Sequence, residues 1–298
     1  MSGILSKYTI QTTKQAFTQQ LRAVGVDTPA LDARLLMMSV MNITHADMIA
    51  HSDRRLTRDM FYKIEMLVER RISGEPIDSV LGYRDFYGRR FHITQDVLSP
   101  RPETEGLIDL ALKHYPEDNQ IKCLDLGTGS GAIIVTLLAE RLEWSGVAVD
   151  ISQAALDVVA INAKVMSSLR PEHRHKLIPD RLELALGSWF EAVDGSFDLI
   201  VSNPPYIDAA HMARLSPEVK NYDPDLALFG GDDGLDAYRA IIARAPDYLV
   251  SGGRLILEIG YDQGAAVADL LGAHGFSGVE THKDLSGHDR IMMGVWGG

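Results

Sequence analysis

The chain has 298 residues, 46% of them apolar, which is enough for a buried core in one large domain or two of ordinary size. The formal net charge of −12 argues against a general nucleic-acid binder and favours a small molecule or a basic protein as partner. A single cysteine, no apolar run of roughly 20 residues and no secretion signal at the start lead us to expect a cytoplasmic protein without disulfides or membrane association.

The first quarter of the chain predicts helices. Thr28-Pro29 is typical of a helix N-cap followed by proline at the first helical position. Thr57 predicts the cap of a further helix, which Gly74-Glu75-Pro76 ends because proline cannot continue it. Residues 83–87 and 91–94 then predict a short β-hairpin.

From about residue 100 the pattern changes to strands that alternate with helices. The predicted strands cover residues 123–126, 147–150, 182–186, 197–201, 254–258, 279–283 and 290–296. The predicted helices among them cover residues 132–140, 153–165, 237–248 and 263–273. This alternation predicts an α/β fold with a parallel, doubly wound sheet of seven strands. Ligands of such sheets bind beyond the carboxyl ends of the strands, where the strand order reverses.

A glycine-rich loop follows the first strand of this sheet. It reads Asp125-Leu126-Gly127-Thr128-Gly129-Ser130-Gly131, and glycines there allow a tight turn and a close approach of a ligand to the backbone. Asp150 ends the next strand, 19 positions after Gly131, where a carboxylate can accept hydrogen bonds from both hydroxyls of a ribose. The loop and the acid together indicate an adenosine-type ligand, and they leave both a dinucleotide and S-adenosylmethionine open.

The tetrapeptide Asn203-Pro204-Pro205-Tyr206 ends the fourth strand and therefore faces the same crevice. Its prolines donate no hydrogen bond and fix their own backbone angle, so the neighbouring carbonyls keep a set direction. The Asn203 side-chain oxygen and the Pro204 carbonyl can accept both hydrogens of a planar NH₂ group, which Tyr206 can cover. This rigid cradle favours methyl transfer to an amine or amide from S-adenosylmethionine, whereas the structural alternative is a plain strand-ending turn.

With these motifs the chain resembles the class I S-adenosylmethionine-dependent methyltransferases, and most closely the bacterial release factor glutamine methyltransferases (the PrmC/HemK family). The resemblance covers almost the whole chain. Besides the glycine loop and the tetrapeptide, it is carried by residues 74–77, 98–105, 188–190, 222–224, 230–235 and 258–260. It implies a Rossmann-like methyltransferase domain at residues 99–298, a β-hairpin linker at 77–98 and a helical substrate-recognition domain at 1–76.

The resemblance also implies roles for single residues. The methionine part of the cofactor would lie against the loop residues Gly127, Thr128, Gly129, Ser130 and Gly131. Asp150 would bind the cofactor ribose and Trp189 would lie beside its adenine. Asn203, Pro204, Pro205 and Tyr206 would bind the substrate amide and carry catalysis, with Asn203 also close to the cofactor.

The implied reaction is methylation of the side-chain amide nitrogen (N5) of the glutamine in the Gly-Gly-Gln motif of class I peptide chain release factors. S-adenosyl-L-homocysteine is its second product. We expect a monomer that binds no nucleic acid directly.

Three alternatives remain open. A sister family methylates a glutamine of a ribosomal protein, but it usually lacks the Pro-Arg-Pro-Glu-Thr-Glu run and has cysteine in the glycine loop, where this chain has Gly127. An adenine-amine methyltransferase of nucleic acid would predict a basic groove. A non-catalytic module that only binds the cofactor would have no use for the tetrapeptide.

No metal site is predicted, because His173-x-His175 lacks the ligand set of a zinc site and the other histidines are scattered. Cys123 lies within a strand and is interpreted as a core residue.

Two loops have open interpretations. Asp223-Pro224 and Gly230-Gly231 could form a mobile lid or an ordinary loop. Residues 167–180 form a longer connection than the family usually has, interpreted as a solvated loop or as a contact for an acidic partner.

Overall fold

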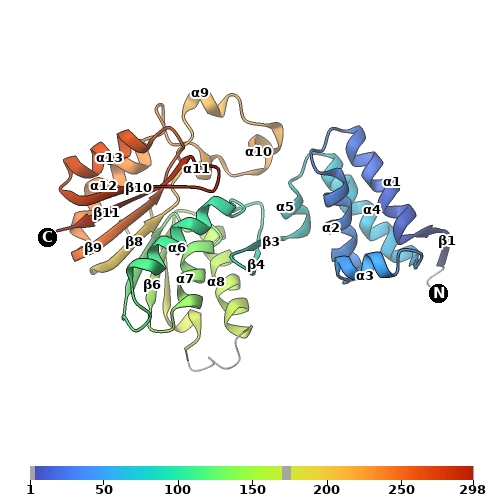
Figure 1. Cartoon of the computed structure of the whole chain (residues 1–298), viewed down its shortest axis with the longest axis horizontal. Helices are drawn as coiled ribbons and strands as arrows, with labels where there is room; N and C mark the ends of the chain where they lie inside the picture. Colours follow the sequence, from blue (N-terminus) through green and yellow to red (C-terminus); the bar gives the residue numbers. More distant parts are fainter. Residues whose placement is uncertain (1–3, 170–175, 298) are drawn as a thin grey trace. The chain divides into compact units, whose positions relative to one another are not determined.

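The computed structural model describes residues 4–169 and 176–297 and forms two compact units (Figure 1). Unit 1 comprises Met1–Gly82 and Pro217–Tyr222, and unit 2 comprises Tyr83–Ser216 and Asp223–Gly298. The predicted hairpin is therefore grouped with unit 2. The division into a recognition domain, a linker and a methyltransferase domain stays a prediction.

Unit 1 is a group of helices with one small antiparallel pair of strands. Its elements are β1 (Ile4–Thr9), α1 (Ile10–Ala23), α2 (Pro29–Met41), α3 (His45–Ala50), β2 (Arg55–Thr57), α4 (Arg58–Ile72), α5 (Ile77–Leu81) and α10 (Pro217–Tyr222). The helices bury their apolar faces in one cluster that includes Phe17, Leu36 and Ile64.

The two predicted helix caps of unit 1 are confirmed, but their side chains bind different partners. The Thr57 hydroxyl accepts a hydrogen bond from the backbone nitrogen of Met60, as an N-cap does. Thr28 is the N-cap of α2 and Pro29 its first residue, as predicted, but the Thr28 side chain makes no cap hydrogen bond and instead donates to Asp32 at 2.7 Å. The reason is the environment of Asp32, which is 1% exposed and also accepts from Arg71 at 2.8 Å.

Arg71 is the buried centre of unit 1. Besides Asp32, its guanidinium contacts Glu218 of α10 at 3.2 Å and the backbone oxygen of Glu75 at 3.0 Å. The Tyr222 hydroxyl donates to the backbone oxygen of Ser73 at 3.3 Å. These contacts explain why α10, far away in the sequence, belongs to the helical unit.

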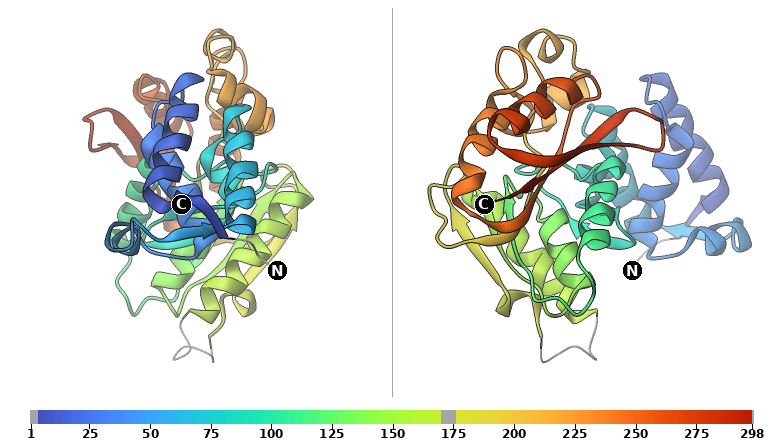
Figure 2. Two further views of the ribbon diagram at one scale, coloured as in Figure 1. Left: turned by 90° about the vertical axis from the view of Figure 1, so that its right-hand side faces the viewer. Right: turned by 60° about the vertical axis from the view of Figure 1, so that its left-hand side comes forward.

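Unit 2 is built on a seven-stranded sheet with the order β10-β11-β9-β8-β5-β6-β7. Its strands are β5 (Lys122–Leu126), β6 (Ser145–Asp150), β7 (Leu182–Leu186), β8 (Phe197–Ser202), β9 (Leu249–Glu258), β10 (Phe276–Lys283) and β11 (Asp289–Trp296). The seven predicted strands are confirmed, but the sheet is mixed, because β11 runs antiparallel to both β9 and β10. The short turn between β10 and β11, seen in Figure 2, requires that direction.

Helices cover both faces of this sheet (Figure 1). The helices of unit 2 are α6 (Glu105–His114), α7 (Ala132–Glu140), α8 (Gln153–Ser168), α9 (Ala209–Met212), α11 (Asp225–Leu228), α12 (Asp236–Arg244) and α13 (Gly264–Ala273), with 3₁₀ turns η1 (Pro102–Thr104), η3 (Ile178–Asp180) and η4 (Ala245–Asp247). One buried cluster joins α6, α7 and α8 to one face, and a second joins α12 and α13 to the other. Because β5 and β8 are buried on both faces, they are nearly continuous apolar runs.

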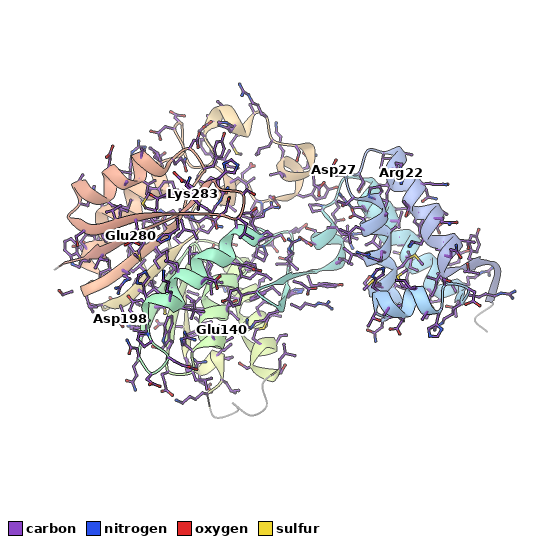
Figure 3. The ribbon with its side chains drawn as sticks, viewed as in Figure 1. Arg22, Asp27, Glu140, Asp198, Glu280 and Lys283 are labelled. Carbon is purple, nitrogen blue, oxygen red and sulfur yellow. The ribbon has the colours of Figure 1, made fainter. Side chains whose placement is uncertain are left out.

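The hairpin of β3 (Tyr83–Phe86) and β4 (Arg89–His92) is tied to these helices. Arg89 donates to Glu140, which Figure 3 labels at the end of α7. Asn162 of α8, fully buried, accepts from the His92 nitrogen at 2.7 Å and donates to the His92 oxygen at 3.1 Å. Within residues 4–169 and 176–297, no helix has the length and apolar character needed to cross a bilayer.

Candidate functional site

A cavity of about 640 Å³ opens at the carboxyl ends of the parallel strands of unit 2. The glycine loop after β5, Asp150 at the end of β6, Trp189 after β7 and Asn203 after β8 all line it. The strand order reverses between β5 and β8, so the cavity lies at the topological switch point. Its volume suits a ligand of nucleoside size with room for a substrate group.

The glycine loop has a backbone that other residues adopt only with strain. Gly127, Gly129 and Gly131 have φ angles of +67°, +56° and +76°, all in the left-handed region. The Thr128 hydroxyl fixes the loop from inside by donating to Asp125 at 2.7 Å. Burial raises the pKa of Asp125 to about 7, against the opposing effect of that hydrogen bond.

Asp150 is oriented by the backbone around it. Its Oδ2 accepts from the Gly129 nitrogen and its Oδ1 from the Ser152 nitrogen, both at 2.9 Å. A carboxylate has about four acceptor positions, so two remain for hydroxyl groups in the cavity. The residues present therefore fit a ribose, and binding of a ribose by Asp150 stays a prediction. Asn162 supports the loop from below, since its Nδ2 donates to the Ser130 oxygen at 2.9 Å.

Trp189 lines the cavity together with Asp150 and the glycine loop. Its φ of +48° is unusual for a bulky residue and marks a constrained backbone. A methyl group at position 127 would lie 3.5 Å from the indole, so the ring stands beside the glycine loop. A flat aromatic face here is suited to pack against a purine.

Asn203 is held by a chain of buried side chains. Its Nδ2 donates to the Thr104 Oγ1 at 3.3 Å, and the Thr104 hydroxyl donates to Glu258 at 2.6 Å. One hydrogen of the amide nitrogen is therefore bound within the protein, while Asn203 lines the cavity. A planar amide with its nitrogen bound in this way presents its oxygen on the opposite side, as an acceptor.

The four tetrapeptide residues do not all reach the cavity. Asn203 and Pro205 line it, whereas the buried Pro204 and the partly buried Tyr206 are not among its lining residues. Burial raises the pKa of Tyr206 to about 12, with the nearby Glu258 carboxylate acting in the same direction. The roles of all four residues toward a substrate stay predictions.

The tetrapeptide backbone is clamped by the second glycine segment. A methyl group at Gly230 would lie 2.7 Å from the Pro205 oxygen and 2.8 Å from the Tyr206 Cα. Gln263 donates to the backbone oxygens of Tyr206 at 3.0 Å and Gly234 at 3.1 Å. Contact this close couples the segment to the tetrapeptide, and whether the segment is a lid or an ordinary loop stays a prediction. Movement of the neighbouring residues 223–229 stays a prediction.

Sequence reasoning gave no role to Thr104, Glu258, Gln263 or Asn162. Thr104 and Glu258 lay in segments that carry the family resemblance, which was the one signal that could have pointed to them. Gln263 and Asn162 had no local signal, because each acts on a backbone far away in the sequence.

Cys123 does not line this cavity. Cys123 is fully buried in β5, and burial raises the pKa of its thiol. Within the part of the chain that the structure describes, no group of three or more His, Cys, Asp or Glu side chains could hold a metal. His173 and His175 lie outside the described residues, as does most of the basic stretch of the 167–180 loop; Lys176 pairs with Glu143.

Comparison with known proteins defines the class. Two family models match: PrmC N-terminal domain over residues 14–82, and methyltransferase small domain over residues 108–216. A solved methyltransferase from Pyrococcus furiosus is 17% identical and has the same fold, with a TM-score of 0.51 over 71% of this chain and 90% of its own. The fold is that of a class I S-adenosylmethionine-dependent methyltransferase, as predicted.

The family follows from curated relatives. The release factor glutamine methyltransferase of Cereibacter sphaeroides is 46% identical over 93% of this chain and 95% of its own length. That of Agrobacterium fabrum is 40% identical over 93% and 94%. The chain belongs to the family of release factor glutamine methyltransferases.

Proposed function

We propose that the protein transfers the methyl group of S-adenosylmethionine to the side-chain amide nitrogen of the glutamine in the Gly-Gly-Gln motif of class I peptide chain release factors. The observation that carries this proposal is the Asn203 amide, whose nitrogen is bound to Thr104 and whose oxygen is left to accept from a substrate NH₂ in the cavity. The membership of the family supports the release factor as the protein that brings that group.

The cofactor would lie along the glycine loop, with its ribose on Asp150 and its adenine beside Trp189. When bound, it supplies a methyl group on a positively charged sulfur, which makes that methyl strongly electrophilic. We therefore propose a reaction without a metal ion.

The substrate nitrogen is a poor nucleophile because its lone pair is delocalised into the amide. The Asn203 Oδ1 and the Pro204 carbonyl are proposed to accept its two hydrogens and to direct its lone pair at the methyl carbon. As that nitrogen gains positive charge, both acceptor bonds strengthen, so the stabilisation is greatest in the transition state. Fixed orientation supplies much of the remaining acceleration. No early general base is needed, since the proton becomes acidic as methylation proceeds.

The other roles follow from this reaction. We propose that residues 1–76 recognise the protein substrate, that the enzyme acts as a monomer in the cytoplasm, and that it binds no nucleic acid directly. The −12 net charge supports the last point, because a nucleic-acid enzyme would need a basic groove.

The test is transfer of label from S-adenosylmethionine to a release factor, ribosomal proteins and DNA offered separately, with peptide mapping of the product. We expect label on the Gly-Gly-Gln glutamine. Asn203→Ala should lower kcat about 10²- to 10³-fold, as loss of a transition-state hydrogen bond does. Asn119→Ala, an exposed loop asparagine, serves as the matched control and should leave the rate unchanged. Label only on a ribosomal protein or on adenine would overturn the choice of substrate.

A further inference from the structure

Thr104 occupies an unexpected place for its side chain. It ends η1 and stands directly before α6, where threonine ordinarily caps the helix. Its backbone is helical instead, with φ −65° and ψ −21°, and it makes no cap hydrogen bond. The residue is 3% exposed, and its hydroxyl is used for the contacts with Glu258 and Asn203.

Glu258 is a buried carboxylate without an ion-pair partner among the described residues. It ends β9, is 1% exposed and accepts from the Thr104 hydroxyl. Arg290 and Arg101, the two arginines whose charges lower the Glu258 pKa, form ion pairs with Asp284 and Asp223 instead. Buried acids are ordinarily paired with a cation, and an exception beside a ligand cavity indicates a functional role.

The positions of the protons in the hydrogen-bonded series Glu258–Thr104–Asn203 determine which way the Asn203 amide faces. An ionised Glu258 can only accept, so the single proton of Thr104 must point to it. The Thr104 oxygen can then only accept from Asn203, which must offer its NH₂. The amide oxygen is thereby left for the cavity.

We propose that Glu258 and Thr104 are positioning residues that act through Asn203: the ionised Glu258 sets the direction of the Thr104 hydroxyl, and that hydroxyl holds the Asn203 amide with its oxygen toward the substrate NH₂. This inference rests on the amide-binding role proposed for Asn203.

Protonation of Glu258 reverses the arrangement. A protonated carboxyl can donate to Thr104, whose own proton is then free to donate to the Asn203 oxygen. The Asn203 amide can then turn over and present its NH₂ to the substrate NH₂. Both groups are hydrogen-bond donors, so the turned amide cannot bind the substrate. The Glu258 anion would also favour the positive charge that develops on the substrate nitrogen. Methyl transfer should therefore fall as pH is lowered through the pKa of Glu258.

That pKa lies in a range that can be measured. Burial raises the pKa of Glu258 to about 7, against the hydrogen bond from Thr104. The charged and titratable groups around Glu258 come from four places: Arg290 on β11, Arg101 and Glu103 at η1, Tyr206 after β8 and Tyr238 on α12. Arg290 and Arg101 lower its pKa and Glu103 raises it.

The first experiment compares isosteric variants at Thr104. Thr104→Val removes the hydroxyl and should lower kcat about 10- to 100-fold, while the Kd for S-adenosylmethionine stays within about twofold. Thr104→Ser keeps the hydroxyl and should restore kcat to within about threefold of the wild type. The matched control is Thr136→Val in α7, whose buried hydroxyl has no hydrogen-bond partner among the described residues, and its kcat should not change. Equal kcat for Thr104→Val and the wild type would overturn the proposal.

The second experiment is the pH profile of kcat for the wild type and Glu258→Gln. The wild type should lose activity below about pH 7, the value to which burial raises the Glu258 pKa. In Glu258→Gln the acid limb should vanish and the plateau should be lower, because a neutral amide can offer Thr104 either a donor or an acceptor. An unchanged acid limb in Glu258→Gln would overturn the proposal, and this readout does not depend on the Thr104 variants folding.

Asn203→Ala separates the two proposals. If it abolishes transfer while Thr104→Val and Glu258→Gln behave as the wild type, the positioning inference fails and the proposed function stands. If wild-type enzyme labels no release factor, the proposed function itself fails. If Asn203→Ala is fully active on the release factor, the role proposed for Asn203 fails, and the positioning inference fails with it.

Discussion

Position 230 accepts only glycine because of the backbone that faces it. The added methyl group of Gly230→Ala would lie 2.7 Å from the Pro205 oxygen and 2.9 Å from the Gly234 oxygen, neither of which can move as a flexible side chain does. We expect a loss of about 1–3 kcal/mol in the free energy of unfolding, as for other overpacked sites. Activity should fall as well, because the tetrapeptide must shift to make room.

The measurement is urea unfolding together with kcat on a release factor. Gly272→Ala provides the control, since nothing lies within 4 Å of the added methyl group and the residue is in helix α13. That variant should be neutral or more stable by about 0.5–1 kcal/mol. A Gly230→Ala enzyme with wild-type stability and activity would contradict the prediction, because it would show that the backbone around position 230 can shift without cost.

At the scale of elements, the buried ion pair between α2 and α4 has the largest expected effect. Asp32→Ala leaves the Arg71 guanidinium, whose side chain is 7% exposed, without its shortest partner. Breaking a buried pair by removing one member costs about 3–5 kcal/mol, so unit 1 should unfold at clearly lower urea concentration. Far-ultraviolet circular dichroism would follow the helices. Asp27→Ala, at an exposed residue of the same unit labelled in Figure 3, should change stability by less than about 0.5 kcal/mol.

The sequence predicted the strands of the sheet but not how all of them pair. Periodicity predicted the seven strands of the sheet, because burial on one or both faces repeats along each strand. The direction of β11 was not predicted correctly, since an apolar run carries no sign of its direction. The pairing of β1 with β2 went unnoticed because the two strands are far apart in the chain and short.

In the site, too, features within one short segment could be predicted from the sequence, and contacts between distant segments could not. The glycine loop and the tetrapeptide could be recognised because all their functional atoms lie within a few consecutive residues. The contact between Thr104 and Glu258 joins residues 154 positions apart and becomes visible only once η1 and β9 are brought together.

For the whole molecule, two buried acids determine how stability depends on pH near neutrality. Burial raises the pKa of Asp125 and of Glu258 to about 7, from ordinary values of 3.8 and 4.5. At pH values between the ordinary and the raised pKa of each acid, the folded protein binds more protons than the unfolded chain. The free energy of unfolding is therefore greatest near the ordinary pKa values and falls as pH rises toward 7. The lowered pKa values of Asp47, Asp208, Asp233 and Asp284 act in the opposite direction, but only near pH 4 and below.

We therefore expect the free energy of unfolding to decrease from pH 5.5 to pH 7.5, an interval set about the raised pKa values. His114 opposes this trend, because burial lowers its pKa, but it is one group that is only partly buried. Urea titrations across the interval would measure the slope, and Glu258→Gln should reduce it. A stability that rises steadily over the same interval would contradict the raised pKa values.

The placement of α10 in unit 1 has a consequence for anyone who treats the two units as interchangeable modules. The polypeptide passes from one unit to the other after Gly82, again after Ser216 and a third time after Tyr222. A fragment that begins at residue 83 would still carry the 6-residue α10, but its Glu218 would have lost Arg71. A chimera with the helical unit of a relative must therefore exchange two separate segments together. The short second segment has to match the helices it will meet.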